Sequence, residues 1–220
     1  MQLSIRMQAV ADMVTPGGKV ADVGTDHGYV PIYLIEQNKA FHAIAMDVRK
    51  GPLARAGENI VRFGCSGRIE TRLSDGLERL EPNEAATVII AGLGGLLTVR
   101  ILEAGLEVLK TVKECVLQPQ SDLDKVRQFL HQHHFCIVQE KMLIDEGKYY
   151  TVMRVVHGEE SPYTEAEDLY GRHLSMIRAR YWQNILQGRR MSKKNYLKHF
   201  TAKIPRRASS GSRSFYMSCR

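Results

Sequence analysis

Apolar and polar positions follow two alternating patterns along the first 157 residues. Short apolar runs typical of buried strands lie at 19–24, 42–48, the start of 68–80, 85–95 and 114–120. Apolar residues at helical spacing lie between and before these runs, at 3–14, 29–38, 51–64, 96–110 and 121–134. Strands that alternate with helices predict an α/β fold with a doubly wound parallel sheet.

The pattern changes near the C-terminal end of this region. Residues 135–158 predict two strands joined by the turn "DEGK", which places one antiparallel strand at or near the edge of the sheet. Gly64 is expected to close the helix 51–64, and Ser121 to cap the helix 121–134. These patterns predict one domain over residues 1–157.

A polar linker, "GEESPY" (158–163), separates this domain from a C-terminal appendage over residues 158–220. Apolar residues at helical spacing predict a helix over 163–190, and the low-complexity stretch 203–220 is expected to be disordered. The apolar positions of this helix are Leu169, Leu174, Ile177, Tyr181, Ile185 and Leu186.

Charge divides the chain at the same place. The net charge is +7, but residues 1–157 hold 18 Lys and Arg against 19 Asp and Glu, whereas residues 158–220 hold 13 against 5. The last acidic residue is Asp168. A neutral body with a basic appendage indicates a polyanionic partner. The alternative is a solvated helix face followed by a disordered end.

Several classes of protein are excluded by the sequence. No apolar run approaches the roughly 18 residues of a membrane span, and the N-terminus lacks the pattern of a signal peptide. The four cysteines, Cys65, Cys115, Cys136 and Cys219, form no C-x-x-C pair, which indicates free thiols and no zinc site. We therefore expect a cytoplasmic protein without a membrane anchor.

Acidic residues surround two glycines after the first predicted strand, in "KVADVGTDHGYVP" (19–31). A dinucleotide fingerprint turns glycines and a helix N-terminus toward a phosphate, and carboxylates at this place would repel it. The loop therefore favours a ligand without phosphate. The residues concerned are Asp22, Gly24, Asp26, His27 and Gly28.

The other predicted strands end in residues that suit a nucleoside. Asp47 follows the second strand, about 20 residues downstream of the glycines, where an acid accepts hydrogen bonds from a ribose. Asp75 ends the third and can accept from an amino group such as adenine N6, while "AGLGG" (91–95) follows the fourth. A nucleoside with a cationic appendage and no phosphate fits this edge of the sheet, and we expect S-adenosyl-L-methionine.

Each of these residues has a purely structural alternative. Asp22 can cap backbone amides, Asp75 can begin a turn, and His27 can be an ordinary surface histidine. The "HQHH" run (131–134) lies at a helix end, where the dipole favours cationic groups, so it does not indicate a metal site. We expect no bound metal.

The chain resembles the bacterial tRNA (adenine(22)-N1)-methyltransferases over roughly residues 1–156. The stretches that carry the resemblance are "LSIRMQAVADMV", "VADVGTDHGYVPIYL", "AGLGG" with "ILEAG", "LQPQ" and "IDEGKYYTVMRV". The resemblance implies a Rossmann-like class I methyltransferase domain, transfer of a methyl group from S-adenosyl-L-methionine to N1 of adenine 22 in tRNA, and a C-terminal appendage of coiled-coil type. The family more often has Asn where this chain has Gln120.

The resemblance also implies roles for individual residues. Asp22, Gly24, Asp26 and His27 fall in the cofactor loop, with Gly28 beside them. Asp26 and His27 are also the catalytic candidates, since a carboxylate near the base could stabilise the charge that develops on it. Asp47 falls at the ribose, Asp75 and Gly76 fall near the adenine, and Gly92, Gly94 and Gly95 fall beside the reacting centre. In the appendage, basic residues are expected to bind tRNA phosphates: Arg178, Arg180, Arg189, Arg190, Lys193 and Lys194.

Two alternatives remain open at this point. One is a methyltransferase with another acceptor, such as ribosomal RNA or a small molecule, because "QPQ" (118–120) faintly resembles the amide-proline loops of amino-methylating enzymes. The other is a non-catalytic RNA-binding protein with a vestigial cofactor pocket. We expect a monomer in either case.

Overall fold

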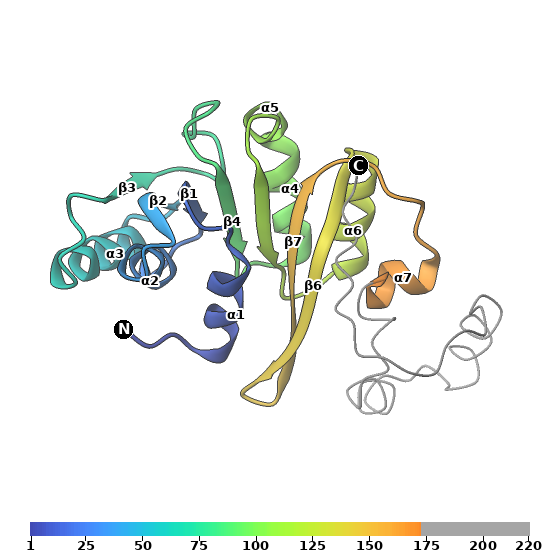
Figure 1. The fold of residues 1–220 in the computed structure, drawn as a ribbon, viewed down its shortest axis with the longest axis horizontal. Coiled ribbons are helices and arrows are strands. Elements are labelled where there is room, and N and C mark those ends of the chain that lie inside the picture. Colours follow the sequence, from blue (N-terminus) through green and yellow to red (C-terminus); the bar gives the residue numbers. More distant parts are fainter. Residues whose placement is uncertain (173–220) are drawn as a thin grey trace.

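The computed structural model describes residues 1–172 (Figure 1). A seven-stranded sheet runs through them in the order β3-β2-β1-β4-β5-β7-β6. The first five strands are parallel, and β7 is antiparallel to its neighbours β5 and β6. The predicted doubly wound sheet with an antiparallel strand next to its edge is confirmed.

The bounds of the elements follow the sequence patterns closely. The strands are β1 (Gly18–Val23), β2 (Ala40–Asp47), β3 (Ile69–Leu73), β4 (Thr87–Ala91), β5 (Glu114–Gln118), β6 (Phe135–Asp145) and β7 (Lys148–His157). The helices are α1 (Ile5–Met13), α2 (Tyr29–Glu36), α3 (Lys50–Arg62), α4 (Gly95–Ala104), α5 (Leu106–Leu109), α6 (Leu123–Gln132) and α7 (Glu165–Tyr170).

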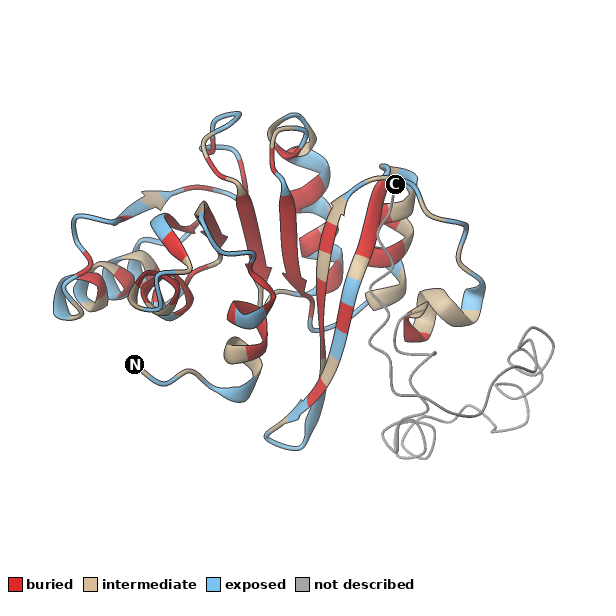
Figure 2. Ribbon diagram, in the orientation of Figure 1, coloured by how far each residue is buried: buried red, intermediate tan, exposed pale blue. Residues whose placement is uncertain are grey.

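Each face of the sheet carries its own apolar core. On one face, α4, α5 and α6 contribute residues such as Leu102, Leu109 and Leu130. On the other, α1 and α2 contribute residues such as Val10 and Ile35. The central strands are buried on both sides (Figure 2), which explains why their sequences are continuous apolar runs rather than alternating ones.

The hairpin formed by β6 and β7 extends beyond the carboxyl ends of β4 and β5 (Figure 1). Its pairing is continuous from Phe135 opposite His157 to Asp145 opposite Lys148, with one irregularity in register between Ile137 and Gln139. The hairpin therefore forms a wall beside the edge of the sheet at which the parallel strands end.

Two local predictions were wrong. The single helix expected over 96–110 is interrupted at Gly105, between α4 and α5. Ser121 does not cap α6, because the residue at its N-cap is Asp122, which has a φ of 49° and makes no capping side-chain bond. The hydroxyl of Ser121 instead accepts a hydrogen bond from the backbone N–H of Gly95, at 3.2 Å.

The segment that follows β7 packs against the body. Tyr170 is 5 % exposed, and the buried guanidinium of Arg127 on α6 pairs with Glu140 on β6 at 2.5 Å and also donates to the carbonyl of Asp168. The helix predicted over 163–190 begins as α7, and α7 ends at its C-cap residue Gly171, which has a φ of 85°. Its remaining part lies outside the described residues.

Candidate functional site

The loop between β1 and α2 has an unusual backbone. Gly24, Asp26 and Gly28 have φ values of 78°, 43° and 71°, so three of five consecutive residues lie in the left-handed region. The backbone N–H groups of Gly24 and Thr25 both donate to the carbonyl of Met46 on β2, at 2.8 and 2.9 Å. The loop is therefore held against the end of β2 in a conformation that favours glycine.

Asp22 is a buried carboxylate at this loop. Its side chain accepts a hydrogen bond of 2.6 Å from the hydroxyl of Thr25. Burial, together with the nearby charge of Asp47, raises its pKa from 3.8 to about 6, although the hydrogen bond from Thr25 lowers it. A cationic ligand placed here would favour the ionised form of Asp22.

Asp26 and His27, the two catalytic candidates, are both partly exposed, at 52 % and 43 % of their side chains. Asp26 forms an ion pair of 2.7 Å with Arg55 on α3, and its other oxygen lies 3.5 Å from the His27 ring. The His27 ring stacks on Tyr29, with centroids 5.3 Å apart. The sequence did not point to Arg55, since it is one charge among several on an amphipathic helix.

Asp47 ends β2 with its side chain buried. One carboxylate oxygen accepts a hydrogen bond of 2.8 Å from the backbone N–H of Arg49. Within the described residues, the second oxygen has no hydrogen-bond partner. An acid held in this way can accept hydrogen bonds from a pair of hydroxyl groups.

Asp75 and Gly76 follow β3, at the same edge of the sheet. The Asp75 carboxylate is exposed and lies 3.2 Å from the guanidinium of Arg100. Gly76 is buried with a φ of 56°, and a side-chain carbon there would lie 3.0 Å from Ile101. The turn after β3 therefore brings an exposed acid beside a tightly packed backbone.

The "AGLGG" stretch connects β4 to α4. Gly92 has a φ of 80° and donates its N–H to the carbonyl of Gln118 at 3.0 Å. Gly94 is exposed at the N-cap of α4. A carbon added at Gly92 would lie 3.3 Å from a guanidinium nitrogen of Arg6, so α1 also reaches this part of the edge.

Arg6 is a further candidate, to which no motif in the sequence points. Its guanidinium donates to the fully buried side chain of Gln118 at 2.9 Å and lies over the ring of Tyr150, 5.2 Å from its centroid. Its backbone N–H donates to Asp145 at 3.3 Å. The sequence around Arg6 gives only a weak indication of a role in the site, because a single arginine in an amphipathic helix is usually an ordinary surface residue.

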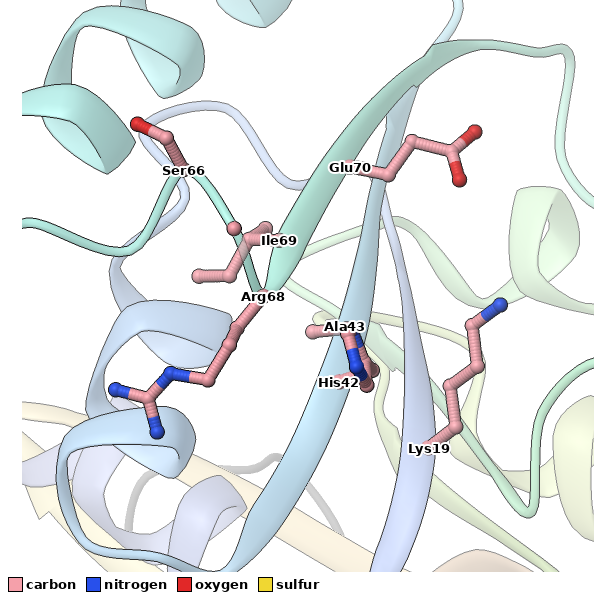
Figure 3. Close-up of a pocket in the computed structure, with 8 residues that line it drawn as sticks. Lys19, His42, Ala43, Ser66, Arg68, Ile69 and Glu70 are labelled. Carbon is pink, nitrogen blue, oxygen red and sulfur yellow. The ribbon is translucent and has the colours of Figure 1, made fainter.

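A hollow of about 350 Å³ lies at the opposite edge, where β1, β2 and β3 begin. Lys19, His42 and Arg68 are among the residues that line it, and the side chains of Lys19 and Arg68 point away from each other (Figure 3). These charges do not converge on a ligand. We therefore place the candidate site at the carboxyl edge, with the loops described above.

The six basic residues expected to bind RNA lie outside the described part of the chain: Arg178, Arg180, Arg189, Arg190, Lys193 and Lys194. Among residues 1–172, no helix is both long and apolar enough to cross a membrane. No group of three or more His, Cys, Asp or Glu side chains in that range is arranged to hold a metal ion.

Comparisons with known proteins show the family to which the chain belongs. A family model described as "Methyltransferase domain" matches residues 3–153. The tRNA (adenine(22)-N(1))-methyltransferase of Bacillus subtilis is 36 % identical over 153 residues, which are 70 % of this chain and 64 % of that protein. The chain belongs to the family of bacterial tRNA (adenine(22)-N1)-methyltransferases.

Solved structures of this family share the fold over most of the chain. A crystal structure of the B. subtilis m1A22 tRNA methyltransferase has a TM-score of 0.79 and 30 % identity, and covers 91 % of this chain and 95 % of that one. Sp1610 of Streptococcus pneumoniae has a TM-score of 0.82 and 33 % identity, with 94 % and 92 % covered. Its complex with S-adenosyl-L-methionine has a TM-score of 0.81 and 35 % identity, with 85 % and 89 % covered.

Proposed function

We propose that this protein is a cytoplasmic enzyme that transfers a methyl group from S-adenosyl-L-methionine to N1 of adenine 22 in tRNA. The observation that carries the proposal is the membership of the m1A22 methyltransferase family, together with the acid-lined loops at the carboxyl edge. The sequence match spans 64 % of the B. subtilis enzyme, so the activity on tRNA is a proposal for this chain.

The residues at the carboxyl edge fit S-adenosyl-L-methionine. Asp22 is a buried carboxylate whose ionised form lacks a cationic partner within the described residues, and the ligand carries two positive charges. The free oxygen of Asp47 suits a ribose, and Asp75 suits an adenine amino group. Gly24, Gly28, Gly76, Gly92 and Gly94 would let the ligand approach the backbone. When bound, the cofactor supplies an electrophilic methyl group.

Methyl transfer to adenine N1 needs no strong general base. Adenine N1 has its own lone pair, so the main task of the protein is to position the base in line with the methyl group. N1 lies on the Watson–Crick edge, so the nucleotide has to be unpaired or flipped out, at a cost of about a few kcal/mol. The basic appendage would offset this cost through contacts with phosphates.

Positive charge moves onto the adenine ring during transfer, and a carboxylate near the base would stabilise it. We propose this role for Asp26, with His27 as its neighbour, although Arg55 holds the same carboxylate. Asp26→Asn should then lower kcat more than it changes the affinity for S-adenosyl-L-methionine. Steady-state kinetics and calorimetry measure the two effects separately, and equal losses would instead make Asp26 a cofactor ligand.

The reaction is tested with the full chain, radiolabelled S-adenosyl-L-methionine and unmodified tRNA transcripts. We expect one methyl group per tRNA, mapped to position 22 by primer extension, and no labelling of a transcript with guanine at that position. Label at another nucleotide, or on ribosomal RNA alone, would identify a different acceptor. Binding of tRNA without transfer would favour a non-catalytic RNA-binding protein.

A further inference from the structure

Arg6 lies on the side of the site that the cofactor residues leave open. In the sheet order, Asp47 and Asp75 follow β2 and β3, whereas the Arg6 guanidinium lies beside Gly92 after β4 and Gln118 at the end of β5. A nucleoside held at β2 and β3 points its other end toward β1 and β4. Arg6 is therefore placed where the methyl acceptor has to enter.

Three other elements contact Arg6, two of them at its guanidinium and one at its backbone. Gln118 of β5 accepts from one of the guanidinium nitrogens, Tyr150 of β7 lies beneath the guanidinium, and Asp145 at the end of β6 accepts from the Arg6 backbone. Figure 1 shows α1 beside the hairpin that forms this wall. A side chain fixed in this way loses less conformational freedom when it binds a ligand.

The charge of Arg6 has no ion-pair partner among the described residues. Its guanidinium has five N–H donors, and Gln118 accepts from one nitrogen. The carboxylate of Asp145 bonds the backbone of Arg6 rather than its side chain. The remaining donors form a planar group that suits a phosphate.

We propose that Arg6 binds a backbone phosphate of the target nucleotide, an inference that rests on the proposed function. A contact with the adenine ring is disfavoured, because the ring becomes positive as N1 is methylated and a cation against it would oppose the transfer. A phosphate stays anionic throughout the reaction. Arg6 then fixes the flipped nucleotide from its backbone side and leaves the base free for the reacting centre.

Three variants of the full chain separate charge from structure. Arg6→Gln removes the charge and keeps an amide that can donate to Gln118, whereas Arg6→Lys keeps the charge. Arg68→Gln is the matched control, because it removes one exposed arginine at the opposite edge of the sheet (Figure 3). Thermal melting and cofactor titration verify that each variant is folded.

The readout is the affinity for tRNA across a series of salt concentrations. We expect Arg6→Gln to weaken binding roughly tenfold and to flatten the slope of log K against log salt by about one unit, the share of one phosphate. Arg6→Lys should retain most of the slope, and Arg68→Gln all of it. Cofactor affinity should be unchanged in all three variants.

Other outcomes separate this inference from the proposed function. If the wild-type chain methylates tRNA and Arg6→Gln binds tRNA with unchanged affinity and slope, the phosphate contact is wrong and the function stands. A loss of kcat with unchanged tRNA affinity and salt slope would also overturn it, since Arg6 would then act after tRNA has bound rather than as a phosphate contact. If the wild type binds tRNA but does not methylate it, the proposed function fails, and the salt slopes still decide the role of Arg6.

Discussion

Asp22 shows how a residue proposed to bind a ligand can cost stability at the scale of one residue. Its carboxylate is buried, with a pKa of about 6 in the folded protein against 3.8 as its ordinary value. The folded state therefore holds the protonated form more tightly than the unfolded state does. Stability is lost as the pH rises from 3.8 through 6, and the full cost is present above pH 7.

Asp22→Asn should therefore stabilise the cofactor-free protein. Two pKa units correspond to about 3 kcal/mol, and the Asn amide oxygen can still accept the hydrogen bond of Thr25. We expect the melting temperature to rise by several degrees at pH 7.5, with the gain shrinking toward pH 4.5. The same variant should bind S-adenosyl-L-methionine more weakly. A variant that melts below the wild type at pH 7.5 would show that the charge of Asp22 does not destabilise the folded protein.

The sequence pointed to the acids and glycines of the candidate site, because each follows an apolar run that ends at the same edge of the sheet. It did not point to the partners of these residues. Arg55 reaches Asp26 from α3, and Arg6 reaches Gln118 from α1, across separations of 29 and 112 residues. Such pairs depend on helix packing, which a pattern along the chain does not encode.

At the scale of elements, the apolar runs predicted the strands and helices well because burial on both faces of the sheet decides them. The two wrong predictions concern helix ends, where single contacts determine the residue at which a helix begins or stops. Gly105 could continue a helix by its sequence context, but a side-chain carbon there would collide with Leu77 of the core. This close approach requires glycine, and Gly105 itself has a φ of −99° and a ψ of 11°, which interrupts the helix between α4 and α5. Ser121 is likewise drawn away from capping α6 by its bond with Gly95.

Gly105→Ala is expected to destabilise the protein although alanine favours helices. The collision with Leu77 should cost about 1–3 kcal/mol, which exceeds the roughly 1 kcal/mol that alanine gains in helix propensity. Gly57→Ala is the matched control, because Gly57 lies inside α3 with open space around it, and it should stabilise by up to about 1 kcal/mol. Urea unfolding measures both. A gain in stability at position 105 equal to that at position 57 would show that Leu77 moves aside freely.

At the scale of the molecule, we propose a catalytic body over 1–157 and a basic appendage over 158–220. Residues 158–172 pack on the body through Tyr170 and through the contacts of Arg127 and Glu160. A fragment that ends at 157 would expose the apolar surface beneath them. A fragment of the body should therefore keep residues 158–172, and residues 173–220 hold 12 Lys and Arg and no acid.

A fragment of residues 1–172 should bind S-adenosyl-L-methionine as the full chain does, because Asp22, Asp47 and Asp75 all lie in the body. Its affinity for tRNA should fall, and the slope of log K against log salt should flatten by several units, since each phosphate contact contributes about 0.9. Replacing four arginines of the full chain with alanine should flatten this slope by up to about four units; they are Arg178, Arg180, Arg189 and Arg190. Calorimetry measures the cofactor, and fluorescence titrations of tRNA across a salt series measure the slopes. If the fragment and the full chain have the same slope, tRNA docks on the body alone. Arg6 and its neighbours at the carboxyl edge would then have to supply the phosphate contacts proposed for the appendage.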